Sequence, residues 1–196
     1  MTLSRLIRRP ELASALGALV IFIFFMIVAP AFRSLDAFAT TLYASSTLGI
    51  VALAVGLLMI GDEFDLSSGV AVTTAALAAT MLNYNLGLNS WVGAFLSLII
   101  ALGIGALNGY LVTRTGIASF LITLAAFLML QGLNLAVTKL VTGQVATPTI
   151  ADMEGFPSAH AVFAGEFHIG NVRISVTVLW WIFFVAVASF VLFRTK

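Results

Sequence analysis

Hydrophobic residues along this chain gather into blocks of about twenty, which short polar joints separate. A helix needs about 20 residues, at ~1.5 Å of rise per residue, to cross a hydrocarbon core of ~30 Å, so each block is long enough to span a membrane. We therefore expect an all-α, polytopic membrane helix bundle that forms a single transmembrane domain over residues 1–196. The expected spans, with boundaries good to about 2–4 residues, are 13–32, 40–61, 65–83, 91–113, 118–139 and 175–193.

Composition narrows the functional classes. Hydrophobic residues make up 61% of the chain and charged residues 9%, which is typical of membrane proteins. About six helices leave no room for a soluble catalytic domain of ~100 residues, so an energy source for transport would have to be another subunit. The net charge of +1 predicts no nucleic-acid partner, and the lack of cysteine excludes disulfides and thiolate chemistry.

Positive charges indicate the orientation, because cytoplasmic loops carry an excess of Lys and Arg. We place the N-terminus in the cytoplasm, and the long joint 140–174 then becomes a periplasmic loop that we expect to fold back onto the membrane surface. The cytoplasmic side holds the larger set of basic residues: Arg5, Arg8, Arg9, Arg114, Arg194 and Lys196, against Arg33, Lys139 and Arg173 outside.

The first block also resembles a signal peptide, with a basic start, an apolar run from Leu16 and small residues at Ala29 and Ala31. The apolar run continues past this site to Phe32, which favours a first membrane span instead.

One polar stripe follows the fifth predicted span. On a helical wheel its members fall within an arc of ~120°: Ser119, Thr123, Gln131, Asn134 and Thr138. Such a stripe could form the wall of a pathway for a polar, uncharged solute. Hydrogen bonding between helices is an equally good interpretation, because Ser and Thr commonly bond to helix carbonyls.

Small residues recur at every fourth position in two spans, which predicts close helix packing. The rows are Ser67, Ala71, Ala75 and Ala79 in the third span, and Ser97, Ala101, Gly105 and Gly109 in the fourth.

The joint between the second and third spans is acidic and has no basic residue nearby; it reads Gly61-Asp62-Glu63-Phe64-Asp65-Leu66-Ser67-Ser68-Gly69. In one interpretation Asp65 caps a helix that begins at Leu66, with Ser67 and Ser68 assisting. In the other, the joint is a break within the membrane, where a short helix points its N-terminus at a solute path.

Catalytic and metal-binding patterns are missing from the sequence. His160 and His168 lie in the long joint without a third ligand pattern, and no Ser-His-Asp set or phosphate-binding Gly-rich loop occurs. We expect neither an enzyme nor a chain that binds a cofactor or a metal.

Three blocks resemble the permease subunits of bacterial ATP-binding-cassette (ABC) importers for monosaccharides, the ribose, xylose, arabinose and galactose class. The blocks are the acidic joint from Asp62 to Gly69, the segments Leu107–Val112 and Gly116–Leu124, and Leu130–Leu133 with Leu140–Gly143. They resemble the family's G-E-F-D-L-S-V-G, L-N-G-x-L-V with I-P-x-F-I-x-T-L, and R-G-L with L-T-G-G. The chain departs from these patterns at Asp62, Ala118 and Gln131, where the family more often has Gly, Pro and Arg.

The resemblance implies a fold of about ten spans built from two inverted halves, of which this chain covers roughly the first half to two thirds. Phe193-Arg194-Thr195-Lys196 resembles the start of the segment that leads into the ATPase-docking helix. We therefore expect a truncated permease, and a form that inserts in the membrane but cannot couple to ATP hydrolysis is an open interpretation.

By resemblance, the chain would lie in the inner membrane of a bacterium, surrounded by membrane lipid. It would pair there with a second permease copy, with two cytoplasmic ATP-binding subunits that bind the ATP, and with a periplasmic sugar-binding protein. The substrate would be a monosaccharide. The residues that we expect to line or position the path are Asp65, Ser67, Asn108, Thr123 and Gln131.

Two other classes compete with this interpretation. A self-contained secondary transporter would act as a homodimer and use Asp62, Glu63 or Asp65 as a proton relay. A membrane-embedded enzyme is the weakest alternative, because it needs His or carboxylate residues that converge within the bilayer.

Overall fold

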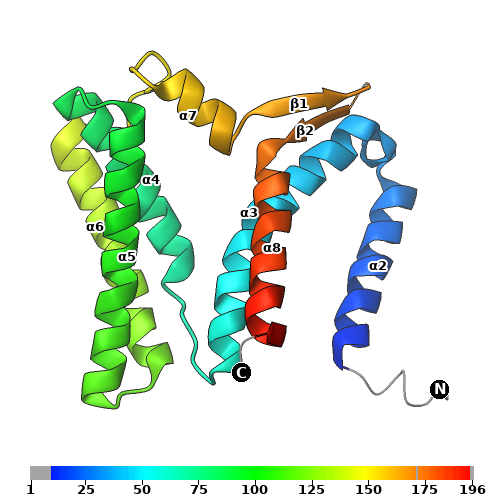
Figure 1. Cartoon of the computed structure of the whole chain (residues 1–196), viewed down its shortest axis with the longest axis horizontal. Coiled ribbons are helices and arrows are strands. Elements are labelled where there is room, and N and C mark those ends of the chain that lie inside the picture. The colour runs from blue at the N-terminus through cyan, green and yellow to red at the C-terminus, as the bar shows by residue number, and fades with distance from the viewer. Residues whose placement is uncertain (1–9, 171, 195–196) are drawn as a thin grey trace.

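The computed structural model describes residues 10–170 and 172–194, and most of this chain is helical (Figure 1). The first predicted span, 13–32, is divided into α2 (Pro10–Val28) and the 3₁₀ helix η1 (Pro30–Arg33). Pro30 explains the break, because the residue before a proline avoids helical geometry, and Ala29 is indeed extended (φ −111°, ψ 99°). Arg33 donates from Nε and Nη2 to the carbonyls of Met26 and Ile27 (2.6 and 2.7 Å), which the end of α2 leaves free.

The second span begins earlier than expected, at residue 35 instead of 40, and forms α3 (Leu35–Ile60). Ser34 sets this start, because its Oγ accepts a hydrogen bond from the N–H of Ala37 (3.1 Å) as an N-cap. The third span begins later than expected, at Ser68 instead of 65, and forms α4 (Ser68–Leu86). Helix α4 thus begins two residues after Leu66, where the capping interpretation placed its start.

The fourth and fifth spans agree with expectation to within three residues, as α5 (Ser90–Thr115) and α6 (Ser119–Thr142). Helices α4, α5 and α6 share one kind of C-terminus, a glycine in the left-handed region, at Gly87, Gly116 and Gly143 (φ 61°, 67° and 74°). Each glycine N–H donates to a carbonyl four residues back in the chain, which ends the helix without strain.

The long joint 140–174 carries structure that the sequence interpretation missed. It contains α7 (Phe156–Phe163) and an antiparallel hairpin of β1 (Glu166–Ile169) and β2 (Val172–Ser175), with Glu166 opposite Ser175 and Ile169 opposite Val172. The chain then enters α8 (Val176–Arg194), which corresponds to the predicted span 175–193. The fold is thus an all-α membrane bundle with one small hairpin at its end.

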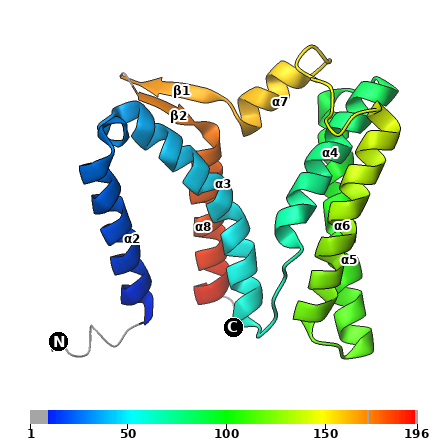
Figure 2. The same cartoon turned by 180° about the vertical axis from the view of Figure 1, so that it is seen from behind.

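The helices form two groups (Figures 1 and 2). Helices α4, α5 and α6 pack against one another, whereas α3 packs along α8, and α2 is joined to the start of α3 through η1. Helix α7 and the hairpin lie across one end and connect the groups, because α7 contacts both α5 and α8 and β2 contacts α3. At the opposite end, the acidic joint leaves α3 and runs back toward the group of α4, α5 and α6 before α4 begins.

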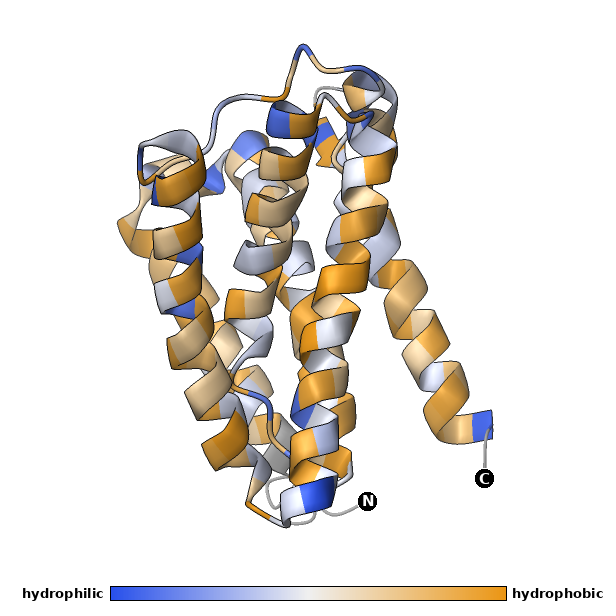
Figure 3. Cartoon of the chain, turned by 90° about the vertical axis from the view of Figure 1, so that its left-hand side faces the viewer, coloured by the Kyte–Doolittle hydropathy of each residue, from blue (hydrophilic) through white to orange (hydrophobic). Residues whose placement is uncertain are grey.

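Burial follows the pattern of a membrane protein rather than that of a soluble one. The most deeply buried side chains in the described residues are polar: Asn83, Thr138, Ser46 and Ser67. Many large apolar side chains are exposed on the helices, and Figure 3 shows hydrophobic residues along most of the helical ribbon. In a membrane, lipid covers apolar side chains and polar groups must find partners inside the protein, so this arrangement fits a bilayer.

Within the described residues, four helices are long and apolar enough to cross a membrane: α3, α5, α6 and α8. The apolar part of α2, Leu12–Val28, is shorter. Helix α4 is not among the four, because its Ser, Thr and Asn residues lower the hydropathy of the helix.

Candidate functional site

The acidic joint is a stretch of non-helical backbone held against α6 by two hydroxyl groups. The N–H of Phe64 donates to Ser119 Oγ (3.0 Å), and the N–H of Leu66 donates to Thr123 Oγ1 (3.2 Å). The Thr123 hydroxyl also lies 3.2 Å from the carbonyl oxygen of Phe64 and 2.8 Å from that of Ser119. Unpaired backbone groups are costly in a membrane, so these side chains allow the helical crossing to be interrupted here.

A chain of polar side chains runs from this joint to α5. Asp65 Oδ1 accepts hydrogen bonds from both the N–H and the Oγ of Ser67 (2.7 Å each), and Asn108 Nδ2 donates to Ser67 Oγ (2.8 Å). Ser67 is 1% exposed and Asn108 6% exposed, whereas Asp65 is half-buried. Asp65 thus orders the turn that leads into α4 through the kind of side-chain-to-backbone bond that the capping interpretation expected, although the helix begins at Ser68 and not at Leu66.

A cavity of about 320 Å³ opens beside this polar chain, between the joint and helices α5 and α6. Its polar walls come from Glu63, Asp65, Asn108, Ser119 and Thr123. Gly105 and Gly109 of the small-residue row also line it, so the row leaves room for the cavity as well as for packing. Four of the five predicted path residues therefore come together, with Asp65, Asn108 and Thr123 on the wall and Ser67 bonded to two of these groups.

Gln131 lies apart from this cluster. It lines a second, more open cavity of about 780 Å³ between α4 and α6, together with Asn134 and Thr138. Thr138 Oγ1 is buried and has no hydrogen-bond partner among the described residues. The polar stripe of α6 thus has two parts. Ser119 and Thr123 bond to the acidic joint, and the other three members line the second cavity.

Packing between α4 and α5 involves residues that the sequence interpretation missed. The side chain of Asn83 lies directly against Gly93, where a Cβ atom would overlap it. Asn83 lies four residues after Ala79, the last member of the row in the third span, and Gly93 lies four residues before Ser97, the first member of the row in the fourth. Extending both rows by one position would have found this contact.

The backbone at Asp62 is unusual, because it is the one non-glycine residue with a positive φ (59°) among the described residues. Asp tolerates the left-handed region better than most residues, whereas a β-branched side chain is strained there by roughly 1–2 kcal/mol. This geometry explains why the permease pattern more often has glycine at the position that Asp62 occupies.

We expect Asp62→Gly to leave the stability of the purified protein unchanged or slightly raised, and Asp62→Val to lower it by about 1–2 kcal/mol. Thermal unfolding of both variants in one detergent checks the result. Equal stability of the two variants would contradict the left-handed geometry.

The family described as "Branched-chain amino acid transport system / permease component" matches residues 37–196. The chain belongs to this family. No solved structure matches the chain.

Several curated relatives of this permease chain carry names of sugar importers. The xylose transport system permease protein XylH of Escherichia coli K12 is 28% identical over 132 residues, which are 67% of this chain and 33% of that protein. The galactose/methyl galactoside import permease protein MglC of Haemophilus influenzae is 28% identical over 163 residues, covering 77% of this chain and 46% of that protein. The fructose import permease protein FruF of Bifidobacterium longum is 32% identical over 100 residues, covering 51% and 28%.

The resemblance to monosaccharide importer permeases is therefore confirmed, and the chain spans about a third to a half of the length of the relatives it matches. A family of transport permeases and apolar helices of spanning length together identify a multi-pass membrane protein.

Proposed function

We propose that this chain forms part of the permease subunit of an ABC importer that moves a monosaccharide inward across the inner membrane. The observation that carries the proposal is the interrupted crossing at 61–67, where non-helical backbone is held by the hydroxyls of Ser119 and Thr123 beside a cavity whose wall includes Asp65 and Asn108. Non-helical backbone at membrane depth occurs where it is buried in protein or lines a water-filled path. Relatives named for import of xylose, galactose and fructose support the sugar class.

The proposed partners are a second permease copy, cytoplasmic ATP-binding subunits and a periplasmic sugar-binding protein. ATP would be bound by the partner subunits, with the N-terminus of this chain in the cytoplasm. In this arrangement Asp65, Ser67, Asn108 and Thr123 line or position the path, and alternating access would change which side of the membrane the cavity faces.

Uptake of radiolabelled xylose, galactose and fructose tests the proposal, in cells whose partner ATP-binding subunit is either intact or unable to hydrolyse ATP. We expect uptake of one of these sugars to require the intact subunit. Uptake that persists without ATP hydrolysis and is abolished by a protonophore would overturn the proposal.

The same assay distinguishes an ABC importer from a proton-coupled homodimer, because the homodimer needs an ionisable carboxyl group in the acidic joint. In Asp65→Asn the amide oxygen can still accept from Ser67, so we expect more than half of the uptake to remain. Complete loss at normal protein abundance would favour the proton relay.

Gln131 is the predicted path residue outside the cluster, and Gln131→Leu tests its role. We expect normal insertion and abundance but uptake reduced by roughly fivefold, because the variant removes an amide from the second cavity at a cost of about 1 kcal/mol in solute binding. Gln144→Leu, in the segment after α6, is the matched control and should leave uptake unchanged. Normal uptake by Gln131→Leu would remove this residue from the path.

A further inference from the structure

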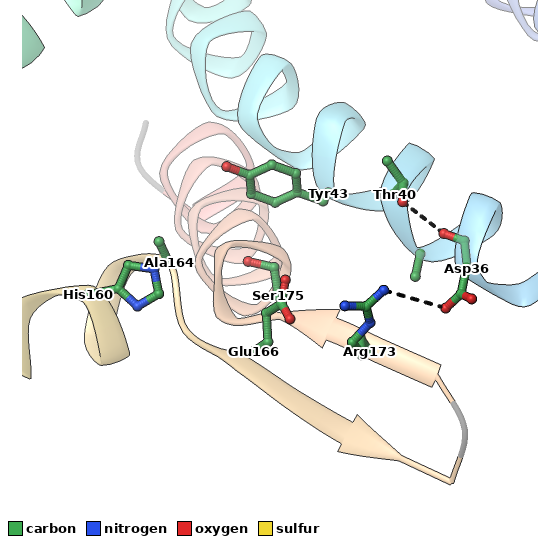
Figure 4. A pocket seen from close by; sticks show the side chains of 9 residues that line it. Asp36, Thr40, Tyr43, His160, Ala164, Glu166, Arg173 and Ser175 are labelled. Atoms are coloured by element: carbon green, nitrogen blue, oxygen red, sulfur yellow. Dashed lines mark hydrogen bonds and ion pairs between the residues drawn. The ribbon is translucent and has the colours of Figure 1, made fainter. Parts of the chain in front are cut away.

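A third cavity lies at the opposite end of the molecule from the acidic joint, between α7, the hairpin and the first turns of α3 (Figures 1 and 4). Its volume is about 340 Å³, within the range of small-molecule sites. The side chains that line it come from separate elements: Asp36, Thr40 and Tyr43 from α3, His160 from α7, Glu166 from β1 and Arg173 from β2.

The polar groups of this cavity are largely unused by the protein. Glu166, His160 and Tyr43 make no side-chain hydrogen bond among the described residues. Arg173 Nη2 lies 4.0 Å from Asp36 Oδ1, and both side chains are more than half exposed, so this pair is weak and leaves hydrogen-bonding capacity on each partner. In Figure 4 the His160 ring, the Glu166 carboxylate and the Arg173 guanidinium turn toward the same space.

The framework around these groups is firmly tied. The Thr177 hydroxyl donates to the carbonyl of Phe163 (3.0 Å), and Trp180 Nε1 donates to that of Val162 (2.8 Å), which fixes α7 to α8. The N–H of Val176 donates to the carbonyl of Gly165 (2.8 Å) and closes the base of the hairpin. The unpaired groups are therefore presented by a preorganised wall, which reduces the entropy cost of binding.

The chemistry of the wall favours a neutral polyol. Arg173 and the Tyr43 hydroxyl donate, the carboxylates of Asp36 and Glu166 accept, and a sugar hydroxyl can do both. The side chain of Tyr43 also offers an apolar ring face. Two carboxylates against one guanidinium disfavour an anion, and the described residues contain no group of three His, Asp or Glu that could hold a metal ion.

We propose that this cavity between α3, α7 and the hairpin is a binding site for a monosaccharide, separate from the cavity at the acidic joint. The site deepens the proposed function and rests on it for the sugar class. In the orientation proposed above, it would receive the sugar on the periplasmic side before the solute enters the membrane path.

The test is saturation-transfer NMR on the full chain purified in lipid nanodiscs, with xylose, galactose and fructose as probes. We expect one sugar to bind, Glu166→Gln to weaken its binding by about tenfold because a charged acceptor becomes a neutral one, and Tyr43→Phe to weaken it by about fivefold because one neutral hydrogen bond is lost. Glu154→Gln is the matched control, since Glu154 is exposed in the preceding loop and does not line the cavity.

Several outcomes would overturn the proposal: no binding of any of the three sugars, or equal affinity for the two cavity variants, the control and the original protein. Displacement of the sugar by methylammonium at equal concentration would indicate a cation site instead. The assay needs no ATP-binding subunit, so sugar binding without ATP-dependent uptake would refute the proposed function alone, and uptake without binding here would refute this site alone.

Discussion

Replacing Asn108 with leucine is expected to reduce sugar uptake by at least about tenfold and to lower stability by roughly 1–3 kcal/mol, the cost of removing one partner of a buried hydrogen bond. Asn108 is 6% exposed and donates to Ser67 Oγ, which in turn donates to Asp65. Without the amide, the buried Ser67 hydroxyl loses its donor, and the turn into α4 loses its tie to α5. Thermal unfolding and uptake at equal protein abundance measure the two effects.

Asn85→Leu is the control for this prediction. Asn85 is an exposed residue of α4 whose Nδ2 bonds to the carbonyl of Met81 within its own helix (2.9 Å). We expect the control to keep both uptake and stability within ~0.5 kcal/mol of the original protein. If Asn108→Leu behaves like Asn85→Leu, the polar chain has no part in the path or the fold.

The second large effect is expected at Gly49, where α3 meets α8. A Cβ atom there would overlap the indole of Trp181, so Gly49→Ala must push a rigid ring out of the contact. Overpacking of this kind costs about 1–3 kcal/mol. We expect the melting temperature of the purified protein to fall and the two helices to separate, which spectroscopic distance measurements between labels on α3 and α8 would detect.

Gly56→Ala lies on the same helix and provides the opposite result. Nothing lies within 4 Å of a Cβ at Gly56, and alanine favours a helix over glycine by about 1 kcal/mol. We expect this variant to be as stable as the original or more so. Equal destabilisation by both alanines would contradict the packing of α3 on α8.

The helices themselves could be predicted from the sequence because each apolar block matches the thickness of a bilayer. The errors at their ends have local causes. Pro30 breaks the first block and was visible in the sequence. Ser34 caps the start of α3. This start was missed because the polar residues Asp36 and Thr40 in the first turns are typical of a loop.

The structure of the acidic joint could not be decided from local sequence. A cap and a break within the membrane require the same residues at Asp65 and Ser67, and the groups that favour the break lie far away in the chain. Asn108 is 41 residues from Ser67, and Ser119 is 55 residues from Phe64. Only the tertiary fold brings these donors and acceptors together.

The hairpin was missed for a different reason. Its strands are only four residues long, too short for a clear alternation of apolar and polar positions. The Gly170-Asn171 pair in the sequence is a turn signal of the kind that joins two short strands, and Gly170 has the positive φ (62°) that such turns require. This pair could have indicated the hairpin and, with it, one wall of the cavity between α3, α7 and the hairpin.

The central claim is that the cavity beside the acidic joint belongs to a water-accessible path, and thiol labelling tests it most directly. The chain has no cysteine, so Gly109→Cys introduces a single thiol at the cavity wall, where an added Cβ atom has open space around it. Gly103→Cys on the same helix is the control, since it also has open space but faces the apolar exterior of α5.

We predict that a membrane-impermeant, water-soluble thiol reagent, supplied on both sides of the membrane, modifies residue 109 and spares residue 103. We also predict that the transported sugar slows the reaction at residue 109. Failure to label residue 109, or equal labelling of both positions, would contradict the account.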